Sequence, residues 1–306
     1  MKDSEHFDLE ELADGVYAAI ATDHGYAVSN SGIVDLGGST LVFDSFLNQR
    51  AANDLKETAK SLFGLDVEYL VNSHHHNDHI WGNEVFSKSK IISSKGTRKL
   101  MATVGKKEAE EDKNEVSKQI QTLLAGLDRA DPDYTVRSSY YRSIEDAFQN
   151  LHLILPSWTF EEKLEINGSK RKVEILAYKG GHTESDSILY LPNDGIAFLG
   201  DLHFIEFHPW FLDGDVDRLS NILEEIQKLD LKKVVPGHGP IGGSHDFKPM
   251  HDYINETKRI ANEAATSGIS IDNAILAGVP SKFEGWKFRR FYGQNLRYLY
   301  DRFTKN

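Results

Sequence analysis

The feature that most constrains this chain is a run of six polar residues, four of them histidine, directly after a short apolar stretch. The run is His74-His75-His76-Asn77-Asp78-His79, and Val67–Asn72 before it has the composition of a buried strand. Layered α/β folds place active sites at such strand ends. Burying this many imidazoles without a counterpart would be costly, and imidazole and carboxylate are ligands for zinc, iron or manganese. We therefore predict that the run binds metal.

The spacing within the run predicts ligands for two ions. Side chains alternate along an extended segment, so His74 and His76 can point the same way. Asp78 and His79 follow on a turn and can face a second point nearby. His75 lies between two predicted ligands, and we expect it to face away from the metals.

Three more candidate ligands follow other predicted strands. His182 lies in Gly-Gly-His-Thr, Asp201 closes Phe-Leu-Gly-Asp, and His238 lies in Pro-Gly-His-Gly-Pro. The neighbouring glycines let the backbone turn tightly beside a ligand. A single histidine at a strand end is more often structural than a ligand. We therefore predict these three residues as ligands only because the histidine run already predicts a metal site.

The order of predicted elements favours a layered α/β fold. Strands are predicted at Val16–Ala21, Tyr26–Leu36, Ser39–Phe46, 67–72, 163–166, 171–178, 187–191, 196–199 and 233–235, and helices at 50–64, 97–127, 138–151, 215–229 and through most of the chain after 247. This order repeats roughly in two halves, which predicts two sheets packed face to face with helices outside.

We expect one main domain over 1–247 that carries a helical insertion at about 97–151. A helical extension, 248–306, is predicted to pack on the same domain. The insertion could border the site or be purely structural, and the extension could cap the core or form a homodimer contact.

Composition narrows the function classes. The 306 residues carry a net charge of −12 and no cysteine. An acidic surface repels phosphate backbones, so we expect a small-molecule substrate and no nucleic acid. The lack of cysteine removes thiolate ligands and a cysteine nucleophile. No stretch approaches the roughly 18 apolar residues of a membrane span, and no apolar run follows the polar segment Met1–Glu5. We therefore expect no membrane association, no secretory signal and a cytoplasmic location.

Taken together, these motifs resemble the metallo-β-lactamase-fold hydrolase superfamily. The match comprises His74-x-His76-x-Asp78-His79, His182, Asp201 and His238 in the family's order, within roughly residues 15–245. The resemblance implies a four-layer αββα sandwich of two mixed sheets. It also implies that His74, His76 and His182 hold one metal, that Asp78, His79 and His238 hold the other, and that Asp201 bridges them. Asp44, at the end of Leu41-Val42-Phe43-Asp44, matches an aspartate that orients the histidine run.

The ligand set is most similar to the glyoxalase-II-like branch of the superfamily. The resemblance then implies a binuclear metal-dependent hydrolase that uses a two-metal-activated hydroxide to cleave an ester, thioester, lactone or related bond, with Asp78 also steering the proton. Zinc is the expected metal for both sites, with iron and manganese as alternatives.

Other readings of the same residues stay open. The main alternative is a mononuclear iron dioxygenase acting on a sulfur substrate, which in this superfamily uses the ligands matching His74, His182 and Asp201. A nuclease fits the net charge poorly, and a non-catalytic binding protein is a further alternative.

Several residues near the motifs could line a substrate pocket, although ordinary packing is an equal alternative for each. They are Trp81, His203, Phe207, His208, Pro209 and Trp210. Glu184 and Asp186 follow His182 and are typical of turn or helix-capping carboxylates.

Overall fold

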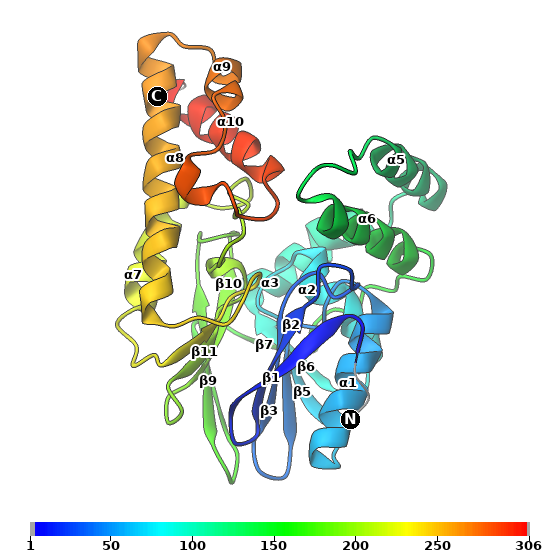
Figure 1. The fold of residues 1–306 in the computed structure, drawn as a ribbon. Coiled ribbons are helices and arrows are strands. Elements are labelled where there is room, and N and C mark those ends of the chain that lie inside the picture. The colour runs from blue at the N-terminus through cyan, green and yellow to red at the C-terminus, as the bar shows by residue number, and fades with distance from the viewer. Residues whose placement is uncertain (1–3, 305–306) are drawn as a thin grey trace.

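The computed structural model describes residues 4–304. Two mixed β-sheets face each other and helices cover their outer faces, so the predicted αββα sandwich is confirmed (Figure 1). Residues 1–3 and 305–306 lie outside the described residues. They include the ends of the two predicted domain ranges and most of the polar segment Met1–Glu5.

The first sheet has seven strands and the second has five. The first follows chain order, β1-β2-β3-β4-β5-β6-β7, and the second runs β12-β11-β10-β9-β8. The strands are β1 Phe7–Ala13, β2 Val16–Ala21, β3 Ser31–Asp35, β4 Thr40–Phe43, β5 Val67–Val71, β6 Lys90–Ser94, β7 Trp158–Phe160, β8 Lys163–Asn167, β9 Lys172–Tyr178, β10 Asp186–Leu191, β11 Ile196–Phe198 and β12 Lys233–Val235.

Helices occupy the remaining ordered segments. The α-helices are α1 Gln49–Phe63, α2 Asn77–Ile80, α3 Lys95–Leu100, α4 Lys106–Ala109, α5 Lys113–Ala125, α6 Tyr134–Phe148, α7 Val216–Ile226, α8 Phe247–Ser267, α9 Ile271–Leu276 and α10 Arg290–Thr304. Short 3-10 segments are η1 Trp81–Phe86, η3 Gly200–Leu202, η4 Ser244–Asp246 and η5 Ser281–Phe283, and η2 Met101–Gly105 is a π-helical turn.

The core lies between the sheets and continues under the helices. Phe43 of β4 and Phe198 of β11 meet between the sheets with ring centroids 6.1 Å apart. On the outer face of the first sheet, α1 is the helix predicted at 50–64, and it buries Ala51, Leu55 and Ala59 against the strands. Apolar faces of α7 and α8 cover the second sheet in the same way.

Three strands of the structure were not predicted from the sequence, and a fourth is shorter than predicted. β1, β6 and β7 were not predicted. β1 alternates with exposed acids, β6 has only two apolar residues between lysine and serine, and β7 has only three residues. The predicted strand from Tyr26 begins only at Ser31. Between these residues the chain turns at Val28, whose φ of +73° is incompatible with an extended β-strand.

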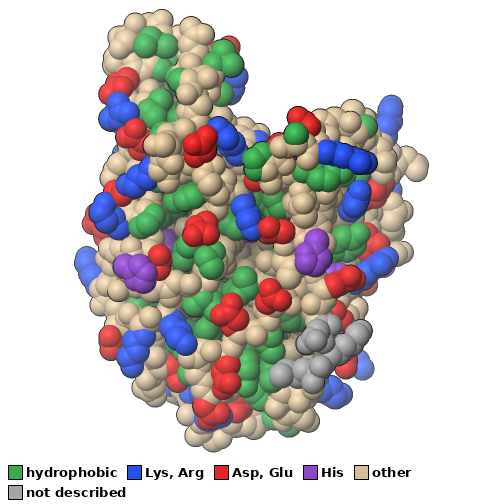
Figure 2. Space-filling view, viewed as in Figure 1, with side chains coloured by type: hydrophobic (Ala, Val, Ile, Leu, Met, Phe, Trp, Pro, Cys, Tyr) green, Lys and Arg blue, Asp and Glu red, His purple; other side chains and the backbone are tan. Residues whose placement is uncertain are grey.

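Two helical projections rise from the same end of the sandwich. One contains α5 and α6 and the other α8, α9 and α10, and a notch separates them on the face in Figure 2. α5 and α6 fall within the predicted insertion, and α8 begins one residue before the predicted extension, which also contains α9 and α10. The division of the chain into these units stays a prediction. Among residues 4–304, no helix combines the length and the apolar character that crossing a bilayer requires.

Candidate metal centre

Five strand ends bring the candidate residues to one edge of the sandwich. β4 leads to Asp44, β5 to the histidine run, β11 to Asp201 and β12 to His238, and the loop from β9 to β10 carries His182. β4 pairs in parallel with β5, and β11 with β12, so the carboxyl ends of each pair meet at the same edge. Gly237 fits this edge because its backbone packs directly on Asp201, and a Cβ there would stand 1.9 Å from Asp201 Oδ1.

The first group of convergent side chains is His74, His76, His182 and Asp201. Their ligand atoms all lie within 4.8 Å of one another. Nε2 of His182 lies 3.0 Å from Nδ1 of His76 and 3.2 Å from Oδ2 of Asp201. These are the residues that the sequence analysis assigned to one metal and its bridge.

The second group is Asp78, His79 and His238. Nε2 of His238 lies 3.2 Å from Oδ2 of Asp78, and Nε2 of His79 lies 3.7 Å from the same oxygen. Asp78 and His79 sit on the short helix α2, which turns them away from His74 and His76. Asp201 Oδ1 is 3.1 Å from Nε2 of His79 and 3.4 Å from Nε2 of His238, so its two oxygens face the two groups.

The donor set fits divalent cations. Nε2 of His74, Nε2 of His79 and Oδ1 of Asp201 are buried and have no hydrogen-bond partner among the described residues. Buried polar atoms are nearly always satisfied, so orphans aimed at a common centre indicate a missing ligand. Imidazole nitrogens and carboxylate oxygens in this arrangement are what zinc, iron and manganese take.

Asp44 lies behind the histidines and belongs to neither group. Its backbone is left-handed, with φ +61°, which turns the carboxylate back under the run. Oδ1 accepts a hydrogen bond from the Ser73 backbone N–H (2.7 Å), and Oδ2 lies 2.7 Å from both Ser73 Oγ and His79 Nδ1. Ser73 Oγ is in turn 2.8 Å from Nδ1 of His74. A carboxylate only accepts hydrogen bonds, so these contacts place the protons of His74 and His79 on Nδ1. Both Nε2 atoms are then free to bind a metal.

A second supporting contact involves a residue that the sequence analysis missed. Oδ2 of Asp213 lies 3.2 Å from Nε2 of His76 and accepts a hydrogen bond from Trp210 Nε1 at 2.6 Å. A proton held on Nε2 leaves Nδ1 of His76 facing the first group. Asp213 stands in the loop before α7, and no motif marked it.

At the two histidines of the second group, the neighbouring carboxylates outweigh the effect of burial. Burial by itself would lower the pKa of His238, but Asp201 and Asp78 raise it to about 9. Burial also acts against His79, yet Asp201, Asp78 and Asp44 hold its pKa well above the usual value. A field that favours a protonated imidazole this strongly also favours a divalent cation. Burial lowers the pKa of His182 to about 3, so it stays neutral and able to coordinate.

A cavity of about 410 Å³ opens from the two groups. Of the residues proposed as pocket walls, Phe207, His208 and Trp210 line it. Trp81 instead packs on Phe148, and His203 is buried against Phe247. His75 is buried and in neither group, and Asp186 accepts hydrogen bonds from Thr183 as a turn carboxylate.

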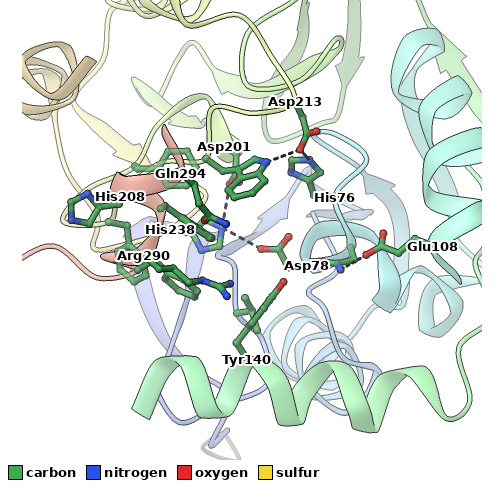
Figure 3. Close-up of a pocket in the computed structure, with 17 residues that line it drawn as sticks. His76, Asp78, Glu108, Tyr140, Asp201, His208, Asp213, His238, Arg290 and Gln294 are labelled. Atoms are coloured by element: carbon green, nitrogen blue, oxygen red, sulfur yellow. Dashed lines mark hydrogen bonds and ion pairs between the residues drawn. The ribbon is translucent and has the colours of Figure 1, made fainter. Parts of the chain in front are cut away.

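Other walls of the cavity come from residues that no motif in the sequence singled out. Glu108 and Tyr140 come from the helical insertion, and Arg290, Phe291 and Gln294 come from α10 (Figure 3). The insertion therefore borders the site. These residues had no recognisable spacing relative to the histidines, because packing of distant helices brings them there.

The chain is similar to known proteins in sequence and in fold. A family model described as "Metallo-beta-lactamase superfamily" matches residues 24–238. Matching solved structures include a metallo-beta-lactamase from Pontibacter korlensis, which is 18% identical and aligns with a TM-score of 0.60 over 81% of this chain and 99% of that chain. A search of curated proteins finds no match. At this identity the structural likeness supports the fold alone.

Proposed function

Because the chain belongs to the metallo-beta-lactamase superfamily, we propose that it is a binuclear metal-dependent hydrolase that cleaves an ester, thioester, lactone or related bond in a small molecule. The observation that carries the proposal is the pair of ligand groups on either side of Asp201, open to a cavity of about 410 Å³. A cavity of this size suits a small molecule, and its aromatic walls suit an apolar one.

Bound divalent cations would supply Lewis acidity and lower the pKa of a water molecule toward neutrality. The first group would hold one cation and the second group the other, with one oxygen of Asp201 facing each. Zinc is the metal we propose, and iron and manganese take the same nitrogen and carboxylate ligands.

The chain's own residues would orient the ligands and move the proton. Asp44 keeps the protons of His74 and His79 on Nδ1, and Asp213 keeps that of His76 on Nε2. Asp78 belongs to the second group and also lines the cavity, so its carboxylate could take the proton of the attacking water.

Tyr140 supplies a hydrogen-bond donor on the opposite wall. Its hydroxyl points toward Asp78 in Figure 3, and burial raises its pKa far above the usual value. The hydroxyl therefore stays protonated at neutral pH. We propose that it donates to the oxygen on which negative charge develops as the carbonyl is attacked.

Elemental analysis combined with a substrate panel tests this proposal. The purified protein should contain two divalent metals and hydrolyse at least one of a thioester, a lactone and an aryl ester. His76→Ala should lose metal and activity together, whereas His245→Ala, which changes an exposed histidine outside both groups, should keep both. A single iron with oxygen consumption on a sulfur substrate would favour the dioxygenase instead. Full turnover by metal-free His76→Ala protein would rule out the metal-dependent mechanism.

A further inference from the structure

We propose that Arg290 forms an anion-binding subsite in the cavity, and that the substrate is an apolar ester, thioester or lactone bearing a carboxylate. This inference rests on the proposed function for the bond that is cleaved, but the binding of the carboxylate can be tested separately. Arg290 is the first residue of α10, and Figure 3 shows its guanidinium pointing into the cavity from the wall opposite the histidine run.

The surroundings of Arg290 are aromatic. The guanidinium carbon lies 5.0 Å from the ring centroid of Phe291, 5.5 Å from that of Tyr141, 5.8 Å from Tyr140 and 5.9 Å from Phe288. Nη1 donates a hydrogen bond to the Tyr141 hydroxyl at 2.5 Å. Ring faces attract the cation and hold its plane, but they do not neutralise its charge.

No acid among residues 4–304 forms an ion pair with Arg290, and its Nε is buried without a hydrogen-bond partner. Arg290 is also the single lysine or arginine among the residues that line the cavity. A cation in a partly enclosed apolar site is costly unless an anion joins it.

The acids of the cavity are engaged elsewhere. Asp78 and Asp201 face the histidines of the two groups. Asp213 is held by His76 and Trp210, and Glu108 accepts a hydrogen bond from Asn77 at 2.7 Å. The negative partner that Arg290 lacks would therefore come from a ligand.

The chemistry of the wall indicates a carboxylate on an apolar body. A guanidinium binds planar carboxylates through parallel N–H donors, and one cation matches one negative charge. A phosphate dianion would meet a single cation in a cavity that contains four aspartate or glutamate side chains. Gln294 lies one helical turn after Arg290 and lines the same cavity, so its amide can join the contact. The surrounding phenylalanine and tyrosine rings would pack against the apolar part of the ligand.

A binding measurement on the full-length metal-loaded protein tests the subsite directly. Isothermal titration should show that phenylacetate binds about tenfold more tightly than the neutral isostere phenylacetamide, as expected for a charge-assisted contact. Arg290→Met should remove this difference in affinity. Arg290→Lys keeps the charge but not the parallel N–H donors of the guanidinium, and it should keep part of the difference. Arg289→Met removes a neighbouring exposed charge that does not line the cavity and should bind both probes like the original protein.

Two outcomes would overturn the subsite. Equal binding of acid and amide by the original protein would show that no anion site exists. A preference for the acid that survives in Arg290→Met would place the carboxylate on the metals. Circular dichroism and the melting temperature establish that each variant is folded, and if Arg290→Met is not, Arg290→Lys and Tyr141→Phe carry the test by weakening the preference severalfold.

A hydrolysis measurement then connects the subsite to the reaction. Monophenyl esters of dicarboxylic acids of increasing chain length are compared with their methyl-capped diesters. We expect at least one chain length to raise kcat/KM about tenfold over its capped partner, and Arg290→Met to abolish that gain while changing hydrolysis of the capped ester less than about threefold. If no ester is cleaved although phenylacetate binds through Arg290, the proposed function fails and the subsite stands. If esters are cleaved without any preference for those that carry a carboxylate, the proposed function stands and the subsite fails.

Discussion

Replacement of Asp44 by asparagine should reduce metal affinity although Asp44 belongs to neither ligand group. The carboxylate is completely buried and accepts from three donors: the Ser73 backbone N–H, the Ser73 hydroxyl and Nδ1 of His79. An amide has the same shape but carries one oxygen and one NH₂ group. Neither orientation of that amide satisfies all three donors.

The size of the effect follows from the two orientations. If the amide NH₂ replaces Oδ1, it faces the Ser73 N–H, and two buried donors oppose each other. If it replaces Oδ2, it faces Nδ1 of His79, which must then give up its proton to Nε2 and lose the lone pair aimed at the metal. An unsatisfied buried group costs about 1–3 kcal/mol, and a tenfold change in affinity corresponds to about 1.4 kcal/mol. We therefore expect metal affinity to fall by roughly tenfold to a hundredfold.

The assay is a zinc titration against a chromophoric chelator at fixed pH, with far-ultraviolet circular dichroism as the check on folding. Asp8→Asn, an exposed change on β1, is the matched control and should bind zinc like the original protein. A folded Asp44→Asn protein with affinity within twofold of the original would refute the argument that Asp44 sets the histidine tautomers.

Three further perturbations test other parts of the fold. Gly237→Ala should lower metal content by at least half in elemental analysis, because its Cβ would stand 1.9 Å from Asp201 Oδ1 and must displace that carboxylate. Phe198→Ala should lower the free energy of unfolding in urea by about 3–5 kcal/mol, since this fully buried ring fills the space between the sheets; a loss below 1 kcal/mol would contradict its place in the core. Burial lowers the pKa of His208 from its ordinary value near 6.5 to about 4. Between these two pH values the unfolded chain binds a proton at His208 and the folded chain does not, so the free energy of unfolding falls as the pH falls. At pH 5 this amounts to about 2 kcal/mol relative to neutral pH, and the difference in urea stability between pH 7.5 and pH 5 should shrink by that much in His208→Gln.

Local patterns carried most of the ligand prediction. The histidine run follows a strand whose apolar composition is visible in the sequence. Alternation places His74 and His76 on one side, and the turn after them directs Asp78 and His79 to the second group. These relations act over a few residues, where backbone geometry sets the direction of each side chain. The same local character explains why α1 and α7 were found close to their true bounds.

Weak local patterns explain the missed elements. β1 is held in the sheet by pairing with β2 although three of its seven residues are exposed acids, and β7 has only three residues. Such strands are stabilised by neighbours in the sheet rather than by their own propensity. The pattern of apolar residues in a single sequence therefore does not reveal such strands.

By itself, the sequence determined which residue types could bind metal, their order along the chain and the two-sheet architecture, because strand periodicity and ligand spacing are local properties. Only the tertiary structure decided which nitrogens converge, and that Asp201 divides its oxygens between two groups. It also decided the walls of the cavity, where Tyr140 and Arg290 arrive from helices 150 positions apart. Those contacts depend on how whole helices pack over the sheet edge, and no spacing within the chain encodes them.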